Sequence, residues 1–113
     1  METRNVDGTG EAVSVLGLGT WPLAGYMGAV DRSDATRLIR SAIDQGVTFV
    51  DTAEAYGDTE TILGEALREG YRKRVVLATK VSRDYSRKGV RKAAEASLKA
   101  LGTDRIDLYQ LHN

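Results

Sequence analysis

The chain has 113 residues, enough for one domain at most, with 42% hydrophobic and 28% charged residues. Its 16 basic and 16 acidic side chains give a formal net charge of zero, so nothing in the composition favours a nucleic acid or an anionic membrane as partner. The absence of cysteine excludes disulfides, thiolate zinc sites and cysteine nucleophiles, and a single histidine offers no metal cluster. The polar first residues and the lack of an apolar run of ~20 residues lead us to expect a cytoplasmic protein.

The first thirty residues predict a β-hairpin, a third strand and a loop. Two short β-prone runs, Thr3 to Val6 and Ala12 to Val15, flank a turn-rich tetrad that begins at Asp7. The run Leu16 to Thr20 continues extended, and a loop containing Gly and Pro spans Trp21 to Val30.

Three repeats of helix, glycine and strand follow. Apolar residues recur at helical spacing after each of three candidate N-cap residues, which are Ser33, Thr59 and Ser86. A glycine closes each predicted helix: Gly46, Gly70 and Gly102. The strands that follow are expected at residues 47–50, 75–79 and 106–111.

The residues at or just after the predicted strand ends follow one another at intervals of about 30 residues: Thr20, Asp51, Lys80 and His112. Alternation of helix and strand at this period indicates parallel β/α units. A (β/α)₈ barrel of ~250 residues has about 31 residues in each unit. A doubly wound sheet has a similar period, so the spacing alone leaves both architectures open.

The glycine pair of the third strand does not complete a dinucleotide-binding fingerprint. Gly17 and Gly19 form a G-x-G, but Pro22 stands where the third glycine belongs, and no helix opens there. We therefore reject a Rossmann arrangement.

Four polar residues lie just past predicted strands or in the loop after one: Asp51, Tyr56, Lys80 and His112. Each alone has an ordinary explanation, as a turn or capping acid, a loop aromatic, a solvated lysine and an unremarkable terminal histidine. In a barrel, however, all β/α loops open on one face, which carries the chemistry. Side-chain alternation along the last strand places Asp107 on the opposite face from His112, toward the helices, which is an unfavourable place for a carboxylate.

These four side chains together suit the donation of a proton. A phenol is a poor acid at neutral pH. A lysine ammonium ~4 Å away would favour the phenolate by up to about 4 kcal/mol at an effective dielectric of ~20, which makes Tyr56 a usable proton donor. Asp51 would hold the ammonium, and His112 could donate a hydrogen bond to a carbonyl oxygen. Such a site suits carbonyl reduction by a hydride from a cofactor.

The chain resembles the aldo-keto reductases over nearly its whole length. Stretches that match the family's motifs in order and spacing are Leu16 to Trp21, Gly46 to Gly57, Glu60 to Gly64, Ala78 to Lys80 and Asp104 to His112. Two departures are Thr48, where many relatives have arginine, and the pair Asp58-Thr59, which lengthens the loop before Glu60 by one residue.

The resemblance implies a (β/α)₈ barrel whose floor is closed by an N-terminal hairpin, and reduction of aldehydes and ketones with NADPH, less often NADH. It implies that Asp51, Tyr56, Lys80 and His112 are the catalytic tetrad, with Tyr56 as proton donor. It places cofactor contacts on Gly19, Thr20, Trp21 and Asp51, and substrate contacts on Trp21, Tyr26 and His112.

Four of eight barrel strands are expected here, with residues 1–15 as the hairpin and residues 16–113 as the first four strands and three helices. We expect an N-terminal half of an aldo-keto reductase, from a truncated reading frame or an incomplete gene, that is inactive or very weak alone. An alternative is a non-catalytic half barrel that self-associates through its exposed sheet edges. A third possibility, a redox-sensing subunit of a channel, has no supporting feature in the sequence.

Overall fold

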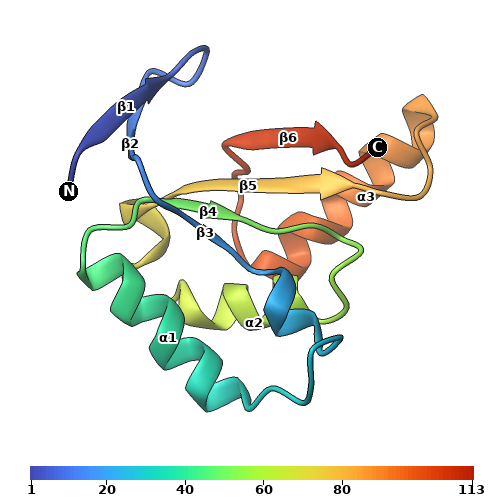
Figure 1. The fold of residues 1–113 in the computed structure, drawn as a ribbon. Helices are drawn as coiled ribbons and strands as arrows, with labels where there is room; N and C mark the ends of the chain where they lie inside the picture. The colour runs from blue at the N-terminus through green and yellow to red at the C-terminus, as the bar shows by residue number, and fades with distance from the viewer.

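An N-terminal hairpin precedes a four-stranded sheet in the computed structural model, which describes residues 1–113 (Figure 1). Strands β1 (Thr3–Val6) and β2 (Glu11–Ser14) pair antiparallel, with Thr3 opposite Ser14, as predicted. Ser14 N donates to Thr48 Oγ1 (2.8 Å) and Thr48 N donates to Ser14 Oγ (2.9 Å). Because Thr48 precedes β4, these bonds place the hairpin at the amino end of the parallel strands.

The sheet contains β3 (Gly17–Gly19), β4 (Phe49–Asp51), β5 (Val76–Val81) and β6 (Leu108–Leu111), all parallel and in sequence order. A doubly wound sheet would reverse its strand order at a switch point. Sequential order is what consecutive strands of a barrel have, so the fold class predicted from the sequence is confirmed.

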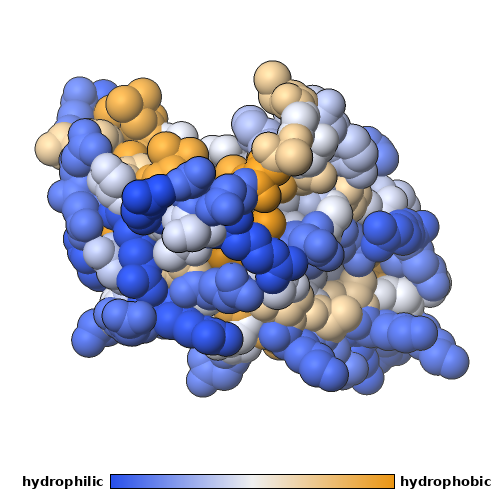
Figure 2. Space-filling view, turned by 90° about the horizontal axis from the view of Figure 1, so that it is seen from below, coloured by the Kyte–Doolittle hydropathy of each residue, from blue (hydrophilic) through white to orange (hydrophobic).

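Three helices connect the strands: α1 (Arg32–Asp44), α2 (Thr59–Ala66) and α3 (Arg87–Leu101). Single turns of 3₁₀ helix, η1 (Trp21–Ala24) and η2 (Arg72–Arg74), were not predicted. The face over the helices that Figure 2 shows is mainly hydrophilic, as expected for amphipathic helices. No helix has both the length and the apolar character that a membrane crossing requires.

Two of the predicted helix starts were wrong. Asp31, not Ser33, caps α1, and its Oδ1 accepts the N–H of Asp34 at 2.9 Å. Asp58 is the N-cap of α2, so Thr59 is the first helical residue. Asp and Ser cap helices about equally well, so Asp31 and Ser33 cannot be ranked from residue type alone.

The boundaries of α3 agree with the sequence prediction. Ser86 Oγ accepts the N–H of Gly89 at 3.0 Å, as an N-cap serine should. Gly102 adopts the left-handed conformation (φ 63°) that ends a helix without a steric cost.

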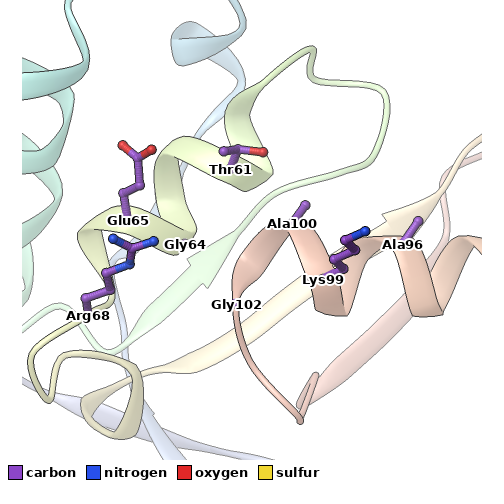
Figure 3. Close-up of a pocket in the computed structure, with 8 residues that line it drawn as sticks. All are labelled: Thr61, Gly64, Glu65, Arg68, Ala96, Lys99, Ala100 and Gly102. Carbon is purple, nitrogen blue, oxygen red and sulfur yellow. The ribbon is translucent and has the colours of Figure 1, made fainter.

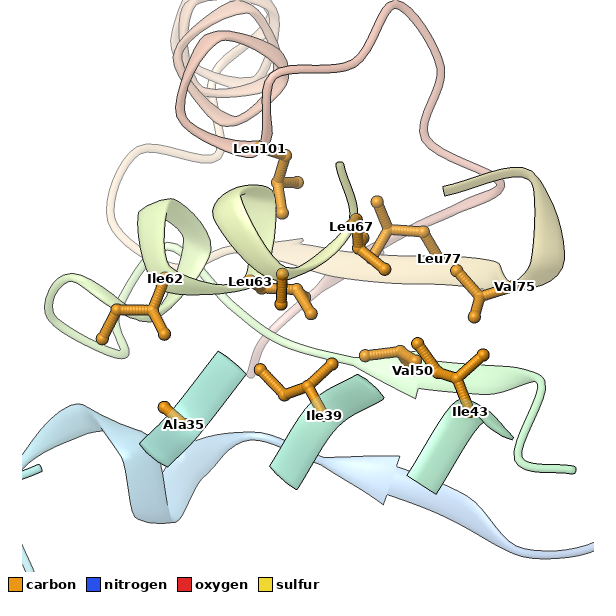
Figure 4. Packing of buried hydrophobic residues seen from close by; sticks show 11 residues of the cluster. Ala35, Ile39, Ile43, Val50, Ile62, Leu63, Leu67, Val75, Leu77 and Leu101 are labelled. Atoms are coloured by element: carbon orange, nitrogen blue, oxygen red, sulfur yellow. The ribbon is translucent and has the colours of Figure 1, made fainter. Parts of the chain in front are cut away.

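The hydrophobic core lies between the sheet and α1 and α2, with Leu101 of α3 closing one side (Figure 4). Ile39, Leu63 and Leu77 are fully buried, and each such side chain contributes about 1.5–3 kcal/mol by leaving water. Helices α2 and α3 approach closely because position 64 is glycine: a Cβ there would come within 2.7 Å of Ala100 O.

Side-chain alternation along β5 separates the helix side from the open side of the sheet. Leu77 belongs to the core, and Thr79 Oγ1 donates to Glu60 on α2 at 2.8 Å. Successive side chains of a strand point to opposite faces, so Val76, Ala78 and Lys80 share the face that carries no helix.

Asp107, expected to face the helices, is accommodated by hydrogen bonds. Its Oδ2 accepts the N–H of Leu77 (2.8 Å) and Arg72 Nη2 (3.0 Å), and its Oδ1 accepts Arg105 Nε (2.8 Å). With 10% of its side chain exposed, Asp107 is a largely buried, fully partnered carboxylate that joins η2, β5 and the start of β6.

Candidate active site

Asp51 ends β4 and is tied to the end of β3. Its carbonyl oxygen accepts both the N–H (3.1 Å) and the hydroxyl (2.9 Å) of Thr20. Thr20 is buried, so this double contact fixes the carboxyl ends of the two strands against each other. The Asp51 carboxylate lies on the open face of the sheet.

Lys80 of β5 reaches across to this carboxylate. Its Nζ donates to Asp51 Oδ2 at 2.7 Å and to Thr52 O at 2.9 Å, while only 14% of the lysine side chain is exposed. A partly buried ion pair with a second acceptor holds the ammonium in one place. An ammonium has three N–H groups, so one remains available.

Tyr56 and His112 complete the cluster. Lys80 Nζ lies 5.3 Å from the centroid of the Tyr56 ring, over its face. The His112 and Tyr56 ring centroids are 5.7 Å apart, with the ring planes at 78°. The structure therefore brings all four predicted side chains together at the carboxyl ends of β4, β5 and β6.

The loop that carries Tyr56 depends on the glycine that follows it. Gly57 has φ 56°, a left-handed conformation, and a Cβ there would lie 3.4 Å from Ala24 O of η1. The carbonyl oxygen of Tyr56 accepts the N–H of Thr59 at 3.0 Å. The loop is thus packed between η1 and the start of α2.

The aromatic residues Trp21 and Tyr26 stack on each other, with ring centroids 6.0 Å apart and an angle of 26°. Trp21 is 45% exposed and Tyr26 68% exposed. Trp21 begins η1 directly after Thr20, beside the end of β3, and Tyr26 lies in the loop that follows η1. The contacts that the structure shows for Tyr26 do not include the four-residue cluster.

Space for a bound molecule exists above the end of β3. Gly19 pairs in register with Asp51, and a Cβ at Gly19 would meet nothing within 4 Å. Asp51 Oδ1 has only a 3.5 Å contact with Gln110 Nε2, and 31% of the Asp51 side chain is exposed. This oxygen is free to accept a hydrogen bond from a hydroxyl group.

Sequence reasoning missed three residues that support the cluster. Ser82 Oγ lies 2.8 Å from His112 Nδ1, and Glu54 Oε1 accepts the N–H of Ser82 at 2.6 Å. Gln110 approaches Asp51 from β6. Alternation along β6 put Gln110 on the same face as His112, but no motif signalled the turn that aims Ser82.

A second group of ionisable side chains lies on the helix side of the sheet. Burial raises the pKa of Glu60, although the hydrogen bond from Thr79 opposes this. Burial also raises the pKa of Tyr109, and the charges of Glu54 and Glu60 add to the effect. Glu60 bonds to Thr79 on the face of β5 opposite Lys80, so it belongs to the packing of α2 on the sheet.

A surface pocket of about 460 Å³ lies between α2 and α3, away from the cluster (Figure 3). Eight residues line it: Thr61, Gly64, Glu65, Arg68, Ala96, Lys99, Ala100 and Gly102. It is a groove where small residues let the helices approach, and it shares no residue with the cluster. No group of three or more His, Cys, Asp or Glu side chains is arranged to hold a metal ion.

Two curated proteins are similar in sequence to almost the whole chain. Aldo-keto reductase YhdN of Bacillus subtilis is 43% identical over 99% of the chain, and methylglyoxal reductase YeaE of Escherichia coli is 39% identical over 99%. The match covers 38% and 40% of these two proteins, so the chain spans about two fifths of their length.

Solved structures show the same fold. An aldo-keto reductase from Klebsiella pneumoniae in complex with NADPH is 40% identical, with a TM-score of 0.85 over 99% of this chain and 40% of that one. A Pseudomonas aeruginosa structure described as an aldo-keto reductase is 39% identical, with a TM-score of 0.89 over 98% of this chain and 47% of that one. The sequence model of the aldo/keto reductase family matches residues 15–113. The chain therefore belongs to the aldo/keto reductase family.

Proposed function

We propose that residues 1–113 are the N-terminal part of an enzyme that reduces aldehydes or ketones to alcohols with NADPH, with Tyr56 as the proton donor. Residues 1–15 form the hairpin at the floor of the barrel, and residues 16–113 supply its first four strands and three helices. The observation that carries the proposal is the cluster of Asp51, Lys80, Tyr56 and His112 at the carboxyl ends of the strands.

Tyr56 gives its hydroxyl proton to the carbonyl oxygen, which becomes the hydroxyl group of the alcohol. Lys80 assists because its ammonium, over the ring face of Tyr56, favours the negative charge that the phenol acquires. Asp51 holds the ammonium in place through the 2.7 Å contact. His112, beside the Tyr56 ring, orients the carbonyl oxygen by a hydrogen bond.

The residues at the end of β3 fit a nicotinamide cofactor. Asp51 Oδ1 can accept a hydrogen bond from a ribose hydroxyl, Gly19 leaves room above the strand, and Thr20 and Trp21 follow Gly19 directly in the chain. The bound nicotinamide supplies the hydride that reduces the carbonyl carbon. We assign NADPH, because the Klebsiella relative was crystallised with it, and NADH is the alternative.

The substrate side of the site is the exposed aromatic pair Trp21 and Tyr26, together with His112. Exposed rings at the rim suit small carbonyl compounds with an apolar or weakly polar body. Methylglyoxal is a sensible first substrate to test, since a relative with 39% identity is a methylglyoxal reductase.

A chimera tests the proposal. Residues 1–113 replace the matching part of YhdN, and NADPH oxidation is measured with methylglyoxal. We expect turnover by the chimera and a loss of about a hundred- to ten-thousandfold in Tyr56→Phe, because a positioned acid contributes that much. The 113-residue chain alone, with half of the barrel strands, should show no turnover. A chimera that binds NADPH but keeps its rate in Tyr56→Phe would contradict the proposal.

A second candidate function is a non-catalytic half barrel that pairs with another copy of itself. Leu16, before β3, and Leu111, on β6, are each 63% exposed, and both edge strands have a free side. Unpaired edges and exposed apolar residues favour association. Light scattering that finds a compact dimer with one cooperative melting transition would support this candidate, whereas a monomer would contradict it.

A further inference from the structure

Ser82, two residues after Lys80, makes a hydrogen bond to the ring of His112. Its Oγ lies 2.8 Å from His112 Nδ1, and this is the one hydrogen bond that the hydroxyl makes with the protein. The backbone of His112 is fixed as well, because its N–H donates to Val81 O at 3.0 Å. Both residues are half-buried at the rim, so the contact sits directly behind the proposed substrate site.

Glu54 holds Ser82 where it can make this contact. Glu54 Oε1 accepts the N–H of Ser82 (2.6 Å) and the N–H of Arg83 (3.1 Å), and only 14% of the Glu54 side chain is exposed. The N–H of Glu54 in turn donates to Lys80 O at 3.2 Å. The loop after β4 therefore fixes the turn after β5, and this turn aims the serine hydroxyl at the imidazole.

We propose that Ser82 is a positioning residue that donates to His112 Nδ1 and keeps the ring proton on Nε2, and that Glu54 acts through Ser82. A neutral imidazole has one donor and one acceptor nitrogen, and the hydrogen bond at one nitrogen decides the state of the other. A hydroxyl that donates to Nδ1 uses its single proton there. The reverse arrangement would leave the serine proton without a protein acceptor.

The tautomer matters for the carbonyl. With the proton on Nε2, the ring nitrogen that does not contact Ser82 is a donor and can hydrogen-bond to a carbonyl oxygen. With the proton on Nδ1, the same nitrogen would present a lone pair to that oxygen and repel it. This inference rests on the proposed function for its consequence, but the tautomer itself is a property of the 113-residue chain.

Nitrogen-15 NMR of the chain measures the tautomer directly, because His112 is the only histidine. We expect a protonated Nε2 and an acceptor Nδ1 in the unmodified chain at a pH where the ring is neutral. Ser82→Ala should show a mixture of both tautomers, and Ser82→Thr, which keeps a hydroxyl, should restore the original state. The control is Ser41→Ala, an exposed serine on α1, which should change nothing.

Glu54 supplies a second, independent pair of variants. Glu54→Gln keeps an oxygen that can accept both backbone N–H groups, so the tautomer should stay on Nε2. Glu54→Ala frees the turn and should give the same mixture as Ser82→Ala. A ring that carries its proton on Nδ1 in the unmodified chain would overturn the proposal. So would tautomer ratios in Ser82→Ala and Glu54→Ala that equal the original ratio.

The chimera separates this inference from the proposed reaction. Loss of one hydrogen bond behind the substrate should lower kcat by about five- to tenfold in Ser82→Ala. The KM for NADPH should stay the same, and Ser82→Thr should recover the rate. An inactive chimera whose ring proton is on Nε2 would refute the proposed function alone, while an active chimera with unchanged kcat in Ser82→Ala would refute the role of Ser82.

Discussion

Ser14 and Thr48 exchange two hydrogen bonds, each through the backbone N–H of one residue and the hydroxyl of the other, at 2.8 and 2.9 Å. The pair joins the hairpin to the amino end of β4, at the opposite end of the strands from Lys80. Thr48 is also the position where the resemblance led us to expect a departure from the arginine of many relatives. The hydroxyl pair is therefore the local means by which this chain attaches its hairpin.

Thr48→Val should detach the hairpin. The substitution keeps the shape of the side chain but leaves the N–H of buried Ser14 without an acceptor, at a cost of about 1–3 kcal/mol in the free energy of unfolding. Urea denaturation measures the change. Thr48→Ser, which keeps the hydroxyl, should lie close to the original stability, and equal losses in both variants would contradict the assignment.

Gly64→Ala should push α2 and α3 apart. The new Cβ would lie 2.7 Å from Ala100 O and 2.8 Å from Leu101 O, both in backbone that cannot rotate away. Overpacking of this kind costs about 1–3 kcal/mol or more. Gly19→Ala is the matched control, because a Cβ there meets nothing within 4 Å, and its unfolding midpoint should barely change.

Asp107→Ala should destabilise the chain. It removes the acceptor of the Leu77 N–H and one acceptor of the Arg72 guanidinium, which keeps Thr103, Val75 and Arg105 as partners, so the cost is about 1–3 kcal/mol. Glu65→Ala breaks the exposed pair with Arg32 and should cost under about 1 kcal/mol. Comparable unfolding free energies for these two variants would show that Asp107 is not a structural anchor.

Glu60 gives the stability of the chain a dependence on pH. Burial raises its pKa in the folded state above the ordinary value of 4.5, so the folded chain binds more protons than the unfolded chain between these two values. The neutral Glu60 carboxyl makes its full contribution to the free energy of unfolding below pH 4.5, and this contribution is lost as the pH rises through the folded-state pKa. Glu60→Gln, which cannot ionise, should flatten this decline in urea midpoints measured from pH 4.5 to neutrality.

Thr79→Val should change the pH dependence of stability in the opposite direction to Glu60→Gln. The hydrogen bond from Thr79 Oγ1 to Glu60 Oε2 favours the charged carboxylate, so its removal should extend the fall in stability to higher pH. An identical pH dependence in the original chain and in Glu60→Gln would exclude Glu60 as the cause.

The sequence predicted the order of elements, the parallel sheet and the meeting of four side chains, because strand period and side-chain alternation are local properties that the fold preserves. It placed the caps of α1 and α2 wrongly, because Asp31 competes with nearby Ser33 for the same backbone groups and α2 begins after Asp58 without a side-chain cap hydrogen bond.

Contacts between distant turns could not be predicted. The link from Glu54 to Ser82 to His112 depends on how the loop after β4 lies over the turn after β5, and no periodicity encodes that geometry. The partners of Asp107 could not be predicted either. Arg72 belongs to a 3₁₀ turn that the sequence pattern did not indicate.

The four-stranded sheet has two interior and two outer strands, and this difference should govern the rate at which backbone amides exchange with deuterium. β4 and β5 are bonded on both sides, whereas β3 and β6 each have a single neighbour. Opening an outer strand disrupts fewer bonds, so its amides should lose protection first while those of Val50 and Leu77 persist longest. Amide protection that increases from the outer strands to the interior strands would then show the order in which the strands of the sheet separate.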